Sequence, residues 1–334
     1  MVRSSSAPSA QQAKEDEIDP LTGQPIAKYM AISPKAGLKA NVAGTSWAYR
    51  RSEVNPDKAS TSKPVVLLVH GLGSSSFSYR NTLGLLGADG YDAVAPDWPG
   101  HGDSDKPSSF NYSEEGMVAA LDAFVAQTCG QQPVALVVQG YVLSQYALLW
   151  AQQNERKVSR LLILNTPLST NSKLRPELAA YKTPLAFMRP KTFDGMMFNA
   201  TGSAYVMEGR VADAYARPYA DPAASAAVAS VMEKCDYGKL LKKVNEGFMT
   251  WKKPSVLMFG GSDPFLSVAS AFEFLEDKRT NMKIISAAAK LGHCPQEDFA
   301  EALHETMLPW LAGTTDEWTS GKTMKMTKYG GVEV

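Results

Sequence analysis

The sequence predicts an α/β fold with a mostly parallel central sheet. Short apolar segments rich in Val, Leu and Ile recur along the chain, as in strands that are buried on both faces. They alternate with amphipathic stretches, and strands that alternate with helices form a parallel sheet covered on both sides. The predicted strands are residues 65–69, 91–95, 134–138, 161–164, 256–259 and 282–286, and the predicted helices lie around 80–87, 114–127, 143–153, 268–274 and 298–311.

One long segment interrupts this alternation. Residues 168–250 contain no strand pattern and are mostly helical in their spacing of apolar residues. Because ligands of open α/β sheets bind outside the carboxyl ends of the strands, an insertion of this size predicts a helical cap that closes a pocket. The predicted organisation is a flexible N-terminal segment at 1–36, a core at 37–167 and 251–312, the cap at 168–250, and a flexible C-terminal tail at 313–334.

Composition excludes several classes of protein. The 334 residues include 34 Lys and Arg against 34 Asp and Glu, a balance that gives no reason to expect binding to nucleic acid. We find no apolar run of the ~18 residues that a membrane-spanning helix needs. Three widely spaced cysteines indicate reduced thiols in a reducing compartment, and neither a disulfide framework nor a zinc site is expected.

Two loops that follow predicted strands carry recognisable motifs. Gly71 and Leu72 come directly after the strand at 65–69, and a His-Gly pair there is typical of a loop whose backbone N–H groups form an oxyanion hole, although a simple tight turn has the same pattern. The full phrase is HGLGSSSFSYR at residues 70–80, and DWPGHGDSDKP follows at 97–107. The pair resembles the α/β-hydrolase superfamily, and within it the branch of the haloalkane dehalogenases, the epoxide hydrolases and the dehalogenase-like proteins of plant and algal plastids.

The resemblance extends from about residue 47 to 311 and includes the cap phrase ADAYARPY at 212–219. It implies an α/β-hydrolase fold with about eight strands, a helical cap, and a catalytic triad in the chain order nucleophile, acid, histidine. The first fourteen residues are rich in Ser and Ala and lack acids, as transit peptides do, although a plain disordered tail has the same composition. Together with the resemblance to plastid proteins, this composition makes a chloroplast location conceivable.

The last two triad positions are filled. Asp263 follows the strand at 256–259, where the family places its acid, and His293 lies in a Gly-His loop like that of the family. An Asp that orients an imidazole allows the His to take a proton from a nucleophile or from water. A purely structural Asp–His hydrogen bond is the alternative interpretation, and the sequence does not separate the two.

The first triad position holds no conventional nucleophile. The family places its nucleophile at a sharp strand-to-helix turn between small residues. Alignment by the strand puts Gly140 in this slot, and alignment by the helix puts Tyr141 there. Because Val142 and Leu143 replace the small neighbours, we do not expect a strained turn.

Other candidate residues have ordinary structural explanations. We expect Ser144 to be a small residue packed in the helix after the turn, and Cys294 to be a packing residue beside His293. Asn165 follows a strand where some dehalogenases carry an acid, a role that an amide cannot fill. His101 is expected to brace its Gly-rich loop, and His304 to lie on the surface.

The leading hypothesis is an α/β-hydrolase-fold protein that lacks the usual Ser, Asp or Cys nucleophile and binds a small apolar ligand under its cap or a protein partner. One alternative is an active hydrolase of the same branch that uses Asp263 and His293, with Tyr141 as a proton donor. The other is an interaction subunit of a thylakoid assembly in the plastid. No metal or organic cofactor is expected.

Overall fold

The structure is a computed structural model that describes residues 34–275, 282–287, 290–317, 324–327 and 330–333. Almost all of the N-terminal segment predicted at 1–36 lies outside these residues. The expectation that it is a transit peptide concerns that segment and stays a prediction. No helix in the described part of the chain has both the length and the apolar character needed to cross a membrane.

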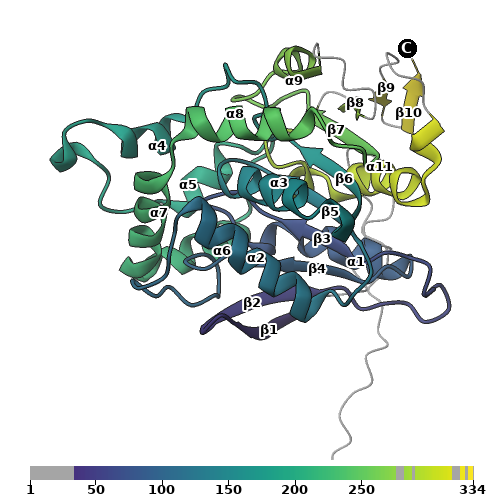
Figure 1. Ribbon diagram of the computed structural model, residues 1–334, viewed down its shortest axis with the longest axis horizontal. Coiled ribbons are helices and arrows are strands. Elements are labelled where there is room, and N and C mark those ends of the chain that lie inside the picture. The colour runs from purple at the N-terminus through teal and green to yellow at the C-terminus, as the bar shows by residue number, and fades with distance from the viewer. Residues whose placement is uncertain (1–33, 276–281, 288–289, 318–323, 328–329, 334) are drawn as a thin grey trace, which may run out of the picture.

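A single ten-stranded sheet forms the centre of the molecule and confirms the predicted α/β-hydrolase architecture (Figure 1). The strands from β4 to β9 run parallel, while β1, β2 and β10 are antiparallel to their neighbours. In sheet order the strands are β1 (Lys35–Val42), β2 (Thr45–Arg51), β4 (Ala93–Pro96), β3 (Val66–Val69), β5 (Val134–Gln139), β6 (Val158–Leu164), β7 (Ser255–Gly260), β8 (Met282–Ala287), β9 (Met324–Thr327) and β10 (Gly330–Glu333).

Strands β1 to β8 match the number expected, and β9 and β10 extend the sheet at one edge. Both lie in the segment for which the sequence predicts a flexible tail, and β9 pairs in parallel with β8. The pattern of the tail is polar, which is why sequence periodicity gives no signal for these edge strands.

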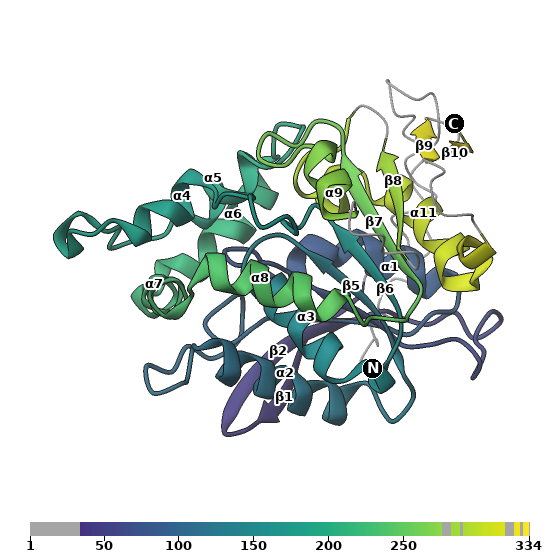
Figure 2. The same ribbon diagram turned by 45° about the horizontal axis from the view of Figure 1, so that its top comes forward.

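Helices cover both faces of the sheet, as Figure 2 shows from a second angle. One apolar cluster packs α1 and α11 against one face, and a larger cluster packs α2, α3, α8 and α9 against the other. The core helices are α1 (Arg80–Ala88), α2 (Glu114–Thr128), α3 (Leu143–Gln153), α8 (Tyr237–Phe248), α9 (Val268–Leu275), α10 (Pro295–Asp298) and α11 (Ala300–Ala312), with 3-10 turns η2 (Ser76–Tyr79), η3 (Glu155–Lys157) and η7 (Thr314–Glu317).

Residues 168–250 form helices and no strand. The elements are α4 (Pro176–Ala179), η4 (Ala180–Lys182), η5 (Ala186–Met188), α5 (Gly195–Ala200), α6 (Gly209–Ala216), η6 (Arg217–Ala220), α7 (Pro222–Lys234) and α8. Helix α8 packs beside α3 of the core, where Gln152 Nε2 donates a hydrogen bond to the Val244 carbonyl at 2.9 Å. The last helix of the predicted cap segment therefore also contacts the core.

Local sequence signals explain where the last cap helices begin. The Asp221 carboxylate accepts a hydrogen bond from the Ala223 N–H at 2.9 Å, with Pro222 in the first helical turn of α7. Asp236 caps α8 in the same way through the Lys239 N–H. Carboxylates at these positions bind N–H groups that the helix itself leaves unpaired, so both helix starts are encoded locally.

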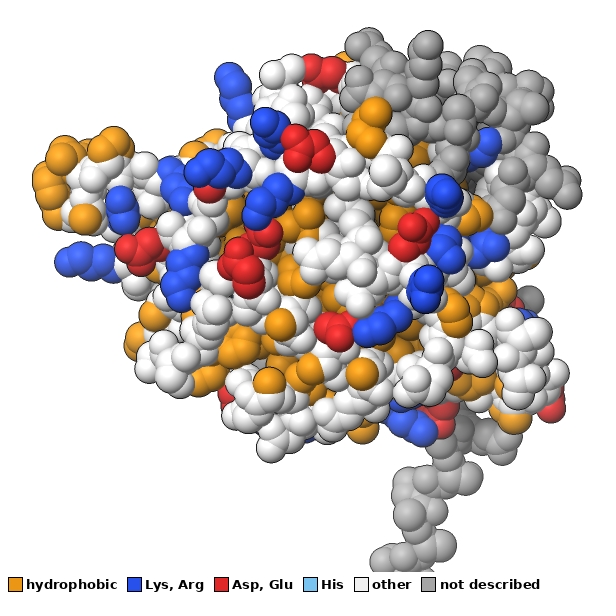
Figure 3. Space-filling view, viewed as in Figure 1, with side chains coloured by type: hydrophobic (Ala, Val, Ile, Leu, Met, Phe, Trp, Pro, Cys, Tyr) orange, Lys and Arg blue, Asp and Glu red, His pale blue; other side chains and the backbone are white. Residues whose placement is uncertain are grey.

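The cap is attached to the core by a partly buried charge cluster. Arg80 of α1 forms two hydrogen bonds with the Glu297 carboxylate, at 2.7 and 2.6 Å, and the Tyr215 hydroxyl of α6 donates to the same carboxylate at 2.6 Å. At its far end the cap projects from the molecule, and hydrophobic side chains gather on this projection in Figure 3.

Candidate functional site

The structure brings Asp263 and His293 together at the carboxyl ends of the parallel strands. Asp263 follows β7 and His293 lies in the loop before α10. Their side chains are buried, and a hydrogen bond of 2.9 Å joins His293 Nδ1 to Asp263 Oδ2. This geometry allows the carboxylate to orient the imidazole and to stabilise its protonated form.

The Asp263 carboxylate has a full set of donors. Oδ1 accepts from the N–H groups of Phe265 and Leu266, at 2.8 and 3.1 Å, and Oδ2 also accepts from Asn165 Nδ2 at 2.7 Å. Burial alone would raise the pKa of Asp263, but the attraction of His293 and these hydrogen bonds hold it below its usual value. Asp263 is therefore ionised at neutral pH.

The His293 backbone is held from both sides. Its N–H donates to the Gly202 carbonyl of the cap at 2.7 Å, and its carbonyl accepts from Gln139 Nε2 of β5 at 2.7 Å. No hydrogen bond joins His293 Nε2 to any residue that the structure describes. The free nitrogen is the atom that could exchange a proton with a ligand or with water.

Gly140, and not Tyr141, occupies the position that faces His293. Gly140 directly follows β5 with a φ of 98°. A Cβ atom built on Gly140 would lie 4.0 Å from His293 Nε2 and 3.2 Å from the Cα of Gly71. Gly140 is the residue that the alignment by the strand puts in the nucleophile slot, and its place there stays a prediction.

The turn after Gly140 is strained, and the expectation of an unstrained turn is wrong. Val142 has φ 60° and ψ −66°, and the Leu143 N–H donates to the Tyr141 carbonyl at 2.7 Å. This is a γ-turn of the rare positive-φ kind, which is costly for a β-branched residue. The fold preserves the sharp strand-to-helix turn although the small flanking residues are absent.

The Tyr141 side chain is buried against His293. The two ring centroids are 5.2 Å apart, and no described residue forms a hydrogen bond with the Tyr141 hydroxyl. Burial, with a further contribution from the charge of Asp263, raises the pKa of Tyr141 above its usual value. The phenol therefore remains protonated and can act as a hydrogen-bond donor.

The predicted oxyanion loop lies against the turn, but one of its donors is already used. The Leu72 N–H donates to the Tyr141 carbonyl at 2.9 Å. A Cβ on Gly71 would lie 2.7 Å from the Tyr141 nitrogen, so glycine is required there by close approach of the two backbones. In this conformation the Leu72 N–H cannot also stabilise an oxyanion.

The remaining sequence candidates have structural roles, with one correction. The buried Ser144 hydroxyl donates to the Gln139 carbonyl, and burial raises the pKa of the Cys294 thiol well above its usual value. His101 is buried, with Nδ1 placed 3.2 Å from the Pro99 carbonyl in its own loop. The expectation that His304 is exposed is wrong, because α11 packs it inward and His304 Nε2 lies 2.8 Å from Asp89 Oδ2.

Sequence reasoning missed two residues of the site. Asn165, set aside as an amide, bridges Asp263 and the Gly260 N–H, the latter at 3.0 Å. Arg175 of the cap is buried close to His293, although an arginine before Pro-Glu has the pattern of an exposed helix start. A lone Asn after a strand is a usable signal, whereas no signal in the sequence identifies Arg175.

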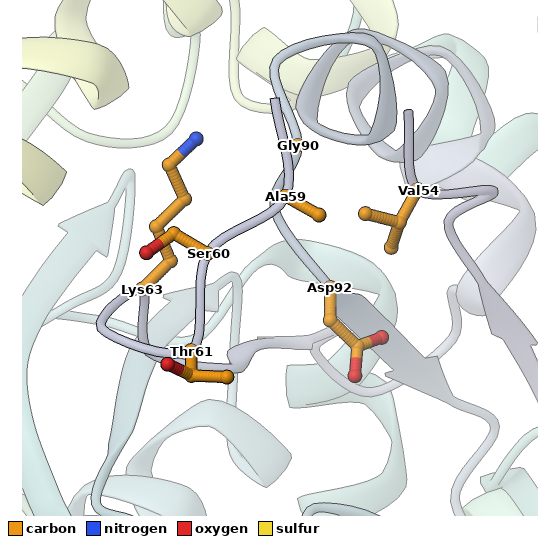
Figure 4. A pocket seen from close by; sticks show the side chains of 7 residues that line it. All are labelled: Val54, Ala59, Ser60, Thr61, Lys63, Gly90 and Asp92. Atoms are coloured by element: carbon orange, nitrogen blue, oxygen red, sulfur yellow. The ribbon is translucent and has the colours of Figure 1, made fainter. Parts of the chain in front are cut away.

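A separate pocket lies at the opposite end of the sheet (Figure 4). It is lined by residues that precede β3 and β4, namely Val54, Ala59, Ser60, Thr61, Lys63, Gly90 and Asp92. The Asp92 carboxylate is already paired with Arg51, at 2.7 and 2.5 Å. Within the described ranges, no group of three or more His, Cys, Asp and Glu side chains is arranged to hold a metal ion, and the expectation that no cofactor is needed stays a prediction.

Comparison with known proteins agrees with this architecture. The model of the "Alpha/beta hydrolase family" matches residues 66–306. The haloalkane dehalogenase of Mycolicibacterium paratuberculosis is 27% identical over 270 residues, which cover 76% of this chain and 85% of that protein. A protein of Rhodobacter capsulatus named "Magnesium-chelatase 30 kDa subunit" is 28% identical over 84% of this chain and 100% of its own length.

Solved structures show the same fold. The haloalkane dehalogenase DbeA from Bradyrhizobium elkani superposes with a TM-score of 0.68 at 22% identity and covers 84% of this chain and 98% of its own. Together with the family match and the order of the loops around Gly140, Asp263 and His293, these similarities show that the chain belongs to the α/β-hydrolase family, on its haloalkane dehalogenase-like branch.

Proposed function

We propose that the chain is a non-hydrolytic member of its family that binds a small ligand between its cap and the Asp263–His293 pair. The observation that carries this proposal is Gly140, which has no side chain at the point 4.0 Å from His293 Nε2 where a nucleophile would begin. Covalent catalysis divides a displacement into two easier steps, and it needs a side chain that can form the intermediate.

The neighbouring side chains do not replace the missing nucleophile. Tyr141 has a reference pKa of ~10, so deprotonation at neutral pH costs about 4 kcal/mol even without burial, and burial here raises the pKa further. The Ser144 hydroxyl is committed to the Gln139 carbonyl. The pair of Asp263 and His293 is retained without a group for it to activate.

A second candidate function follows from the same pair. Because His293 Nε2 is free and Asp263 orients the ring, His293 could activate water directly or transfer a proton to a substrate. This alternative predicts a reaction that needs His293 but forms no covalent intermediate.

A third candidate is an interaction subunit. The relative from Rhodobacter capsulatus that carries the word subunit in its name aligns over its full length, which favours a protein partner for this chain as well. The proposed chloroplast location stays a prediction. Co-purification of the full chain with a stoichiometric partner, lost when the cap surface is mutated, would support this function over ligand binding.

A turnover comparison tests the leading proposal. Hydrolysis of 4-nitrophenyl butyrate, 1-bromohexane and styrene oxide would be measured for the wild type, His293→Ala and the matched control Ser144→Ala. We expect only the residual ~10³–10⁴-fold rate over water that binding effects can supply, nearly equal in all three proteins. Robust turnover that collapses in His293→Ala would refute the proposal and support the water-activating alternative.

A further inference from the structure

Arg175 is a buried cation with one edge unpaired. Its side chain is fully buried, and Nη2 donates to Glu177 Oε1, the Phe198 carbonyl and Thr201 Oγ1 at 2.9, 2.8 and 2.9 Å. Nη1, by contrast, is buried and has no hydrogen-bond partner in the part of the chain that the structure describes. A buried donor left unsatisfied destabilises the protein, and more so when it is charged, so this edge of the guanidinium favours a bound acceptor.

The unpaired edge faces the wall of the site that contains His293. A Cβ on Gly202 would lie 3.4 Å from Arg175 Nη1 and 3.2 Å from the Cβ of His293, so Gly202 lies between these two side chains. The Arg175 guanidinium carbon also lies 3.9 Å from the centre of the Phe265 ring, whose edge-on contact with the His293 ring spans 5.7 Å.

A second unpaired donor lies next to His293. The Tyr141 hydroxyl is buried and has no hydrogen-bond partner among the described residues, and its ring lies 5.2 Å from the imidazole. Two unpaired donors that both lie near one imidazole match a ligand group with two acceptor oxygens.

The surroundings indicate a negative charge on that ligand group and an apolar body behind it. Glu177, the counter-ion of Arg175, is 36% exposed and sits at the opposite edge of the guanidinium, so its charge is partly screened by water. The guanidinium lies between the aromatic rings of Phe198 and Phe265, at 3.7 and 3.9 Å. An anion would therefore gain both the charge-assisted hydrogen bonds and contact with aromatic surface.

We propose that Arg175 Nη1 and the Tyr141 hydroxyl bind the carboxylate of a small organic acid with an apolar body, next to His293. This inference rests on the proposed ligand-binding function and makes it specific: the ligand expected from the sequence to be apolar is instead an amphipathic anion. Arg175 supplies the charge and Tyr141 supplies a neutral hydrogen bond, so the two contributions can be separated.

Binding of matched ligands to the full chain tests the proposal by calorimetry and thermal shift. The acids are phenylacetate, hexanoate and decanoate, and each is compared with the alcohol of the same carbon skeleton. We expect saturable binding of at least one acid and at least about tenfold weaker binding of its alcohol, since a hydrogen bond between charged groups is stronger than one to a neutral hydroxyl. Equal affinity of acid and alcohol, or no saturable binding of any of the three acids, would overturn the anion site.

Two variants locate the bound acid. Tyr141→Phe removes only an unpaired hydroxyl, so the chain should fold and bind the acid about tenfold more weakly. Gly202→Ala should abolish binding, because the new methyl group would stand between Arg175 and His293. The matched control is Gly209→Ala, a cap glycine with no atom within 4 Å of an added Cβ, which should bind as the wild type does.

The outcomes separate this proposal from the function on which it rests. If acid and alcohol bind equally and Gly202→Ala abolishes both, the chain binds ligands under its cap but has no anion site. If Tyr141→Phe and Gly202→Ala leave the affinity for the acid unchanged, the acid binds elsewhere and the proposal is wrong. If turnover of an ester depends on His293, the non-hydrolytic function falls, whatever the affinity for acids.

Discussion

The loop after β5 and the loops that carry Asp263 and His293 meet at one edge of the sheet, yet they differ in what they retain. Asp263 has four hydrogen bonds to its carboxylate, and His293 is held through its side chain and both backbone groups. The turn after β5 keeps its sharp geometry at Gly140 and Val142, but Gly140 itself has no side chain to present to the imidazole.

This difference teaches that retention of an acid–base pair is weak evidence for catalysis. Three of the four partners of Asp263 are buried and would lose their acceptor without it, so the fold itself favours the carboxylate. They are Asn165, Leu266 and His293. The turn has no such dependence on a nucleophile, since its geometry is set by the close approach of Gly71 and the γ-turn at Val142. Stability alone can therefore maintain the pair after hydrolysis is lost.

The largest expected effect on stability is that of removing the Asp263 carboxylate. Asp263→Ala would leave His293 Nδ1, Asn165 Nδ2 and the loop N–H groups without an acceptor, and we expect a loss of about 3–5 kcal/mol in the free energy of unfolding. Urea denaturation measures it. Asp263→Asn, which keeps the shape and one acceptor oxygen, is the control and should lose clearly less. Equal stability of Asp263→Ala and wild type would show that the pair is not structural.

The second largest expected effect is a loss of stability in mild acid, which comes from the buried His70 beside the predicted oxyanion loop. The Trp98 N–H donates to His70 Nε2 at 3.3 Å, so this nitrogen must stay unprotonated. Burial lowers the pKa of His70 from 6.5 to about 4, and burial with the neighbouring His70 lowers that of His101 to about 3.

Because the folded chain resists protonation that the unfolded chain accepts, stability is full above pH ~6.5 and falls as the pH drops toward about 4. The shift at His70 corresponds to a loss on the order of 3 kcal/mol across that window. Urea midpoints measured along a pH series check this, with His70→Gln expected to lose less. Asp263, whose folded pKa is lowered, adds its own loss only below about pH 4. A flat profile between neutral pH and pH ~4.5 would contradict the account.

The smallest expected effect separates strain from packing at the turn. Gly140→Ala adds a side chain at φ 98° and 3.2 Å from the Gly71 Cα, whereas Gly130→Ala adds one at φ 74° in open space. A positive φ costs about 1–2 kcal/mol in either variant, and the crowding at Gly140 should add about 1 kcal/mol. Identical unfolding free energies for the two variants would mean that the turn can relax away from Gly71.

The sequence predicts the fold and the acid–base pair because both depend on strand ends. Asp263 and His293 each follow an apolar segment that can be read only as a strand, so their positions at the strand ends can be predicted. The nucleophile slot cannot be placed in this way, because the alignments by the strand and by the helix differ by one residue. Choosing between them requires the backbone geometry.

Other features depend on contacts between segments far apart in the sequence, which the periodicity of apolar residues does not reveal. His304 is buried because α11 meets the end of α1 at Asp89, 215 residues away in sequence. The strained turn at Val142 depends on Gly71, a residue of another loop. Because Gly71 has no Cβ, the backbone of the turn can approach it closely. Arg175 is buried because Phe198 and Phe265 enclose it, one from the cap and one from the loop after β7.

The most direct test of the central claim, that no covalent intermediate forms, is the mass of the intact protein after rapid quenching with 4-nitrophenyl butyrate or 1-bromohexane. Gly140→Cys, whose new side chain would begin 4.0 Å from His293 Nε2, is the positive control for access of the reagents to the site. We predict that the variant gains mass and that the wild type keeps its unmodified mass at every time point. An acyl or alkyl adduct on wild-type protein that maps to Tyr141 or Ser144 would contradict the account.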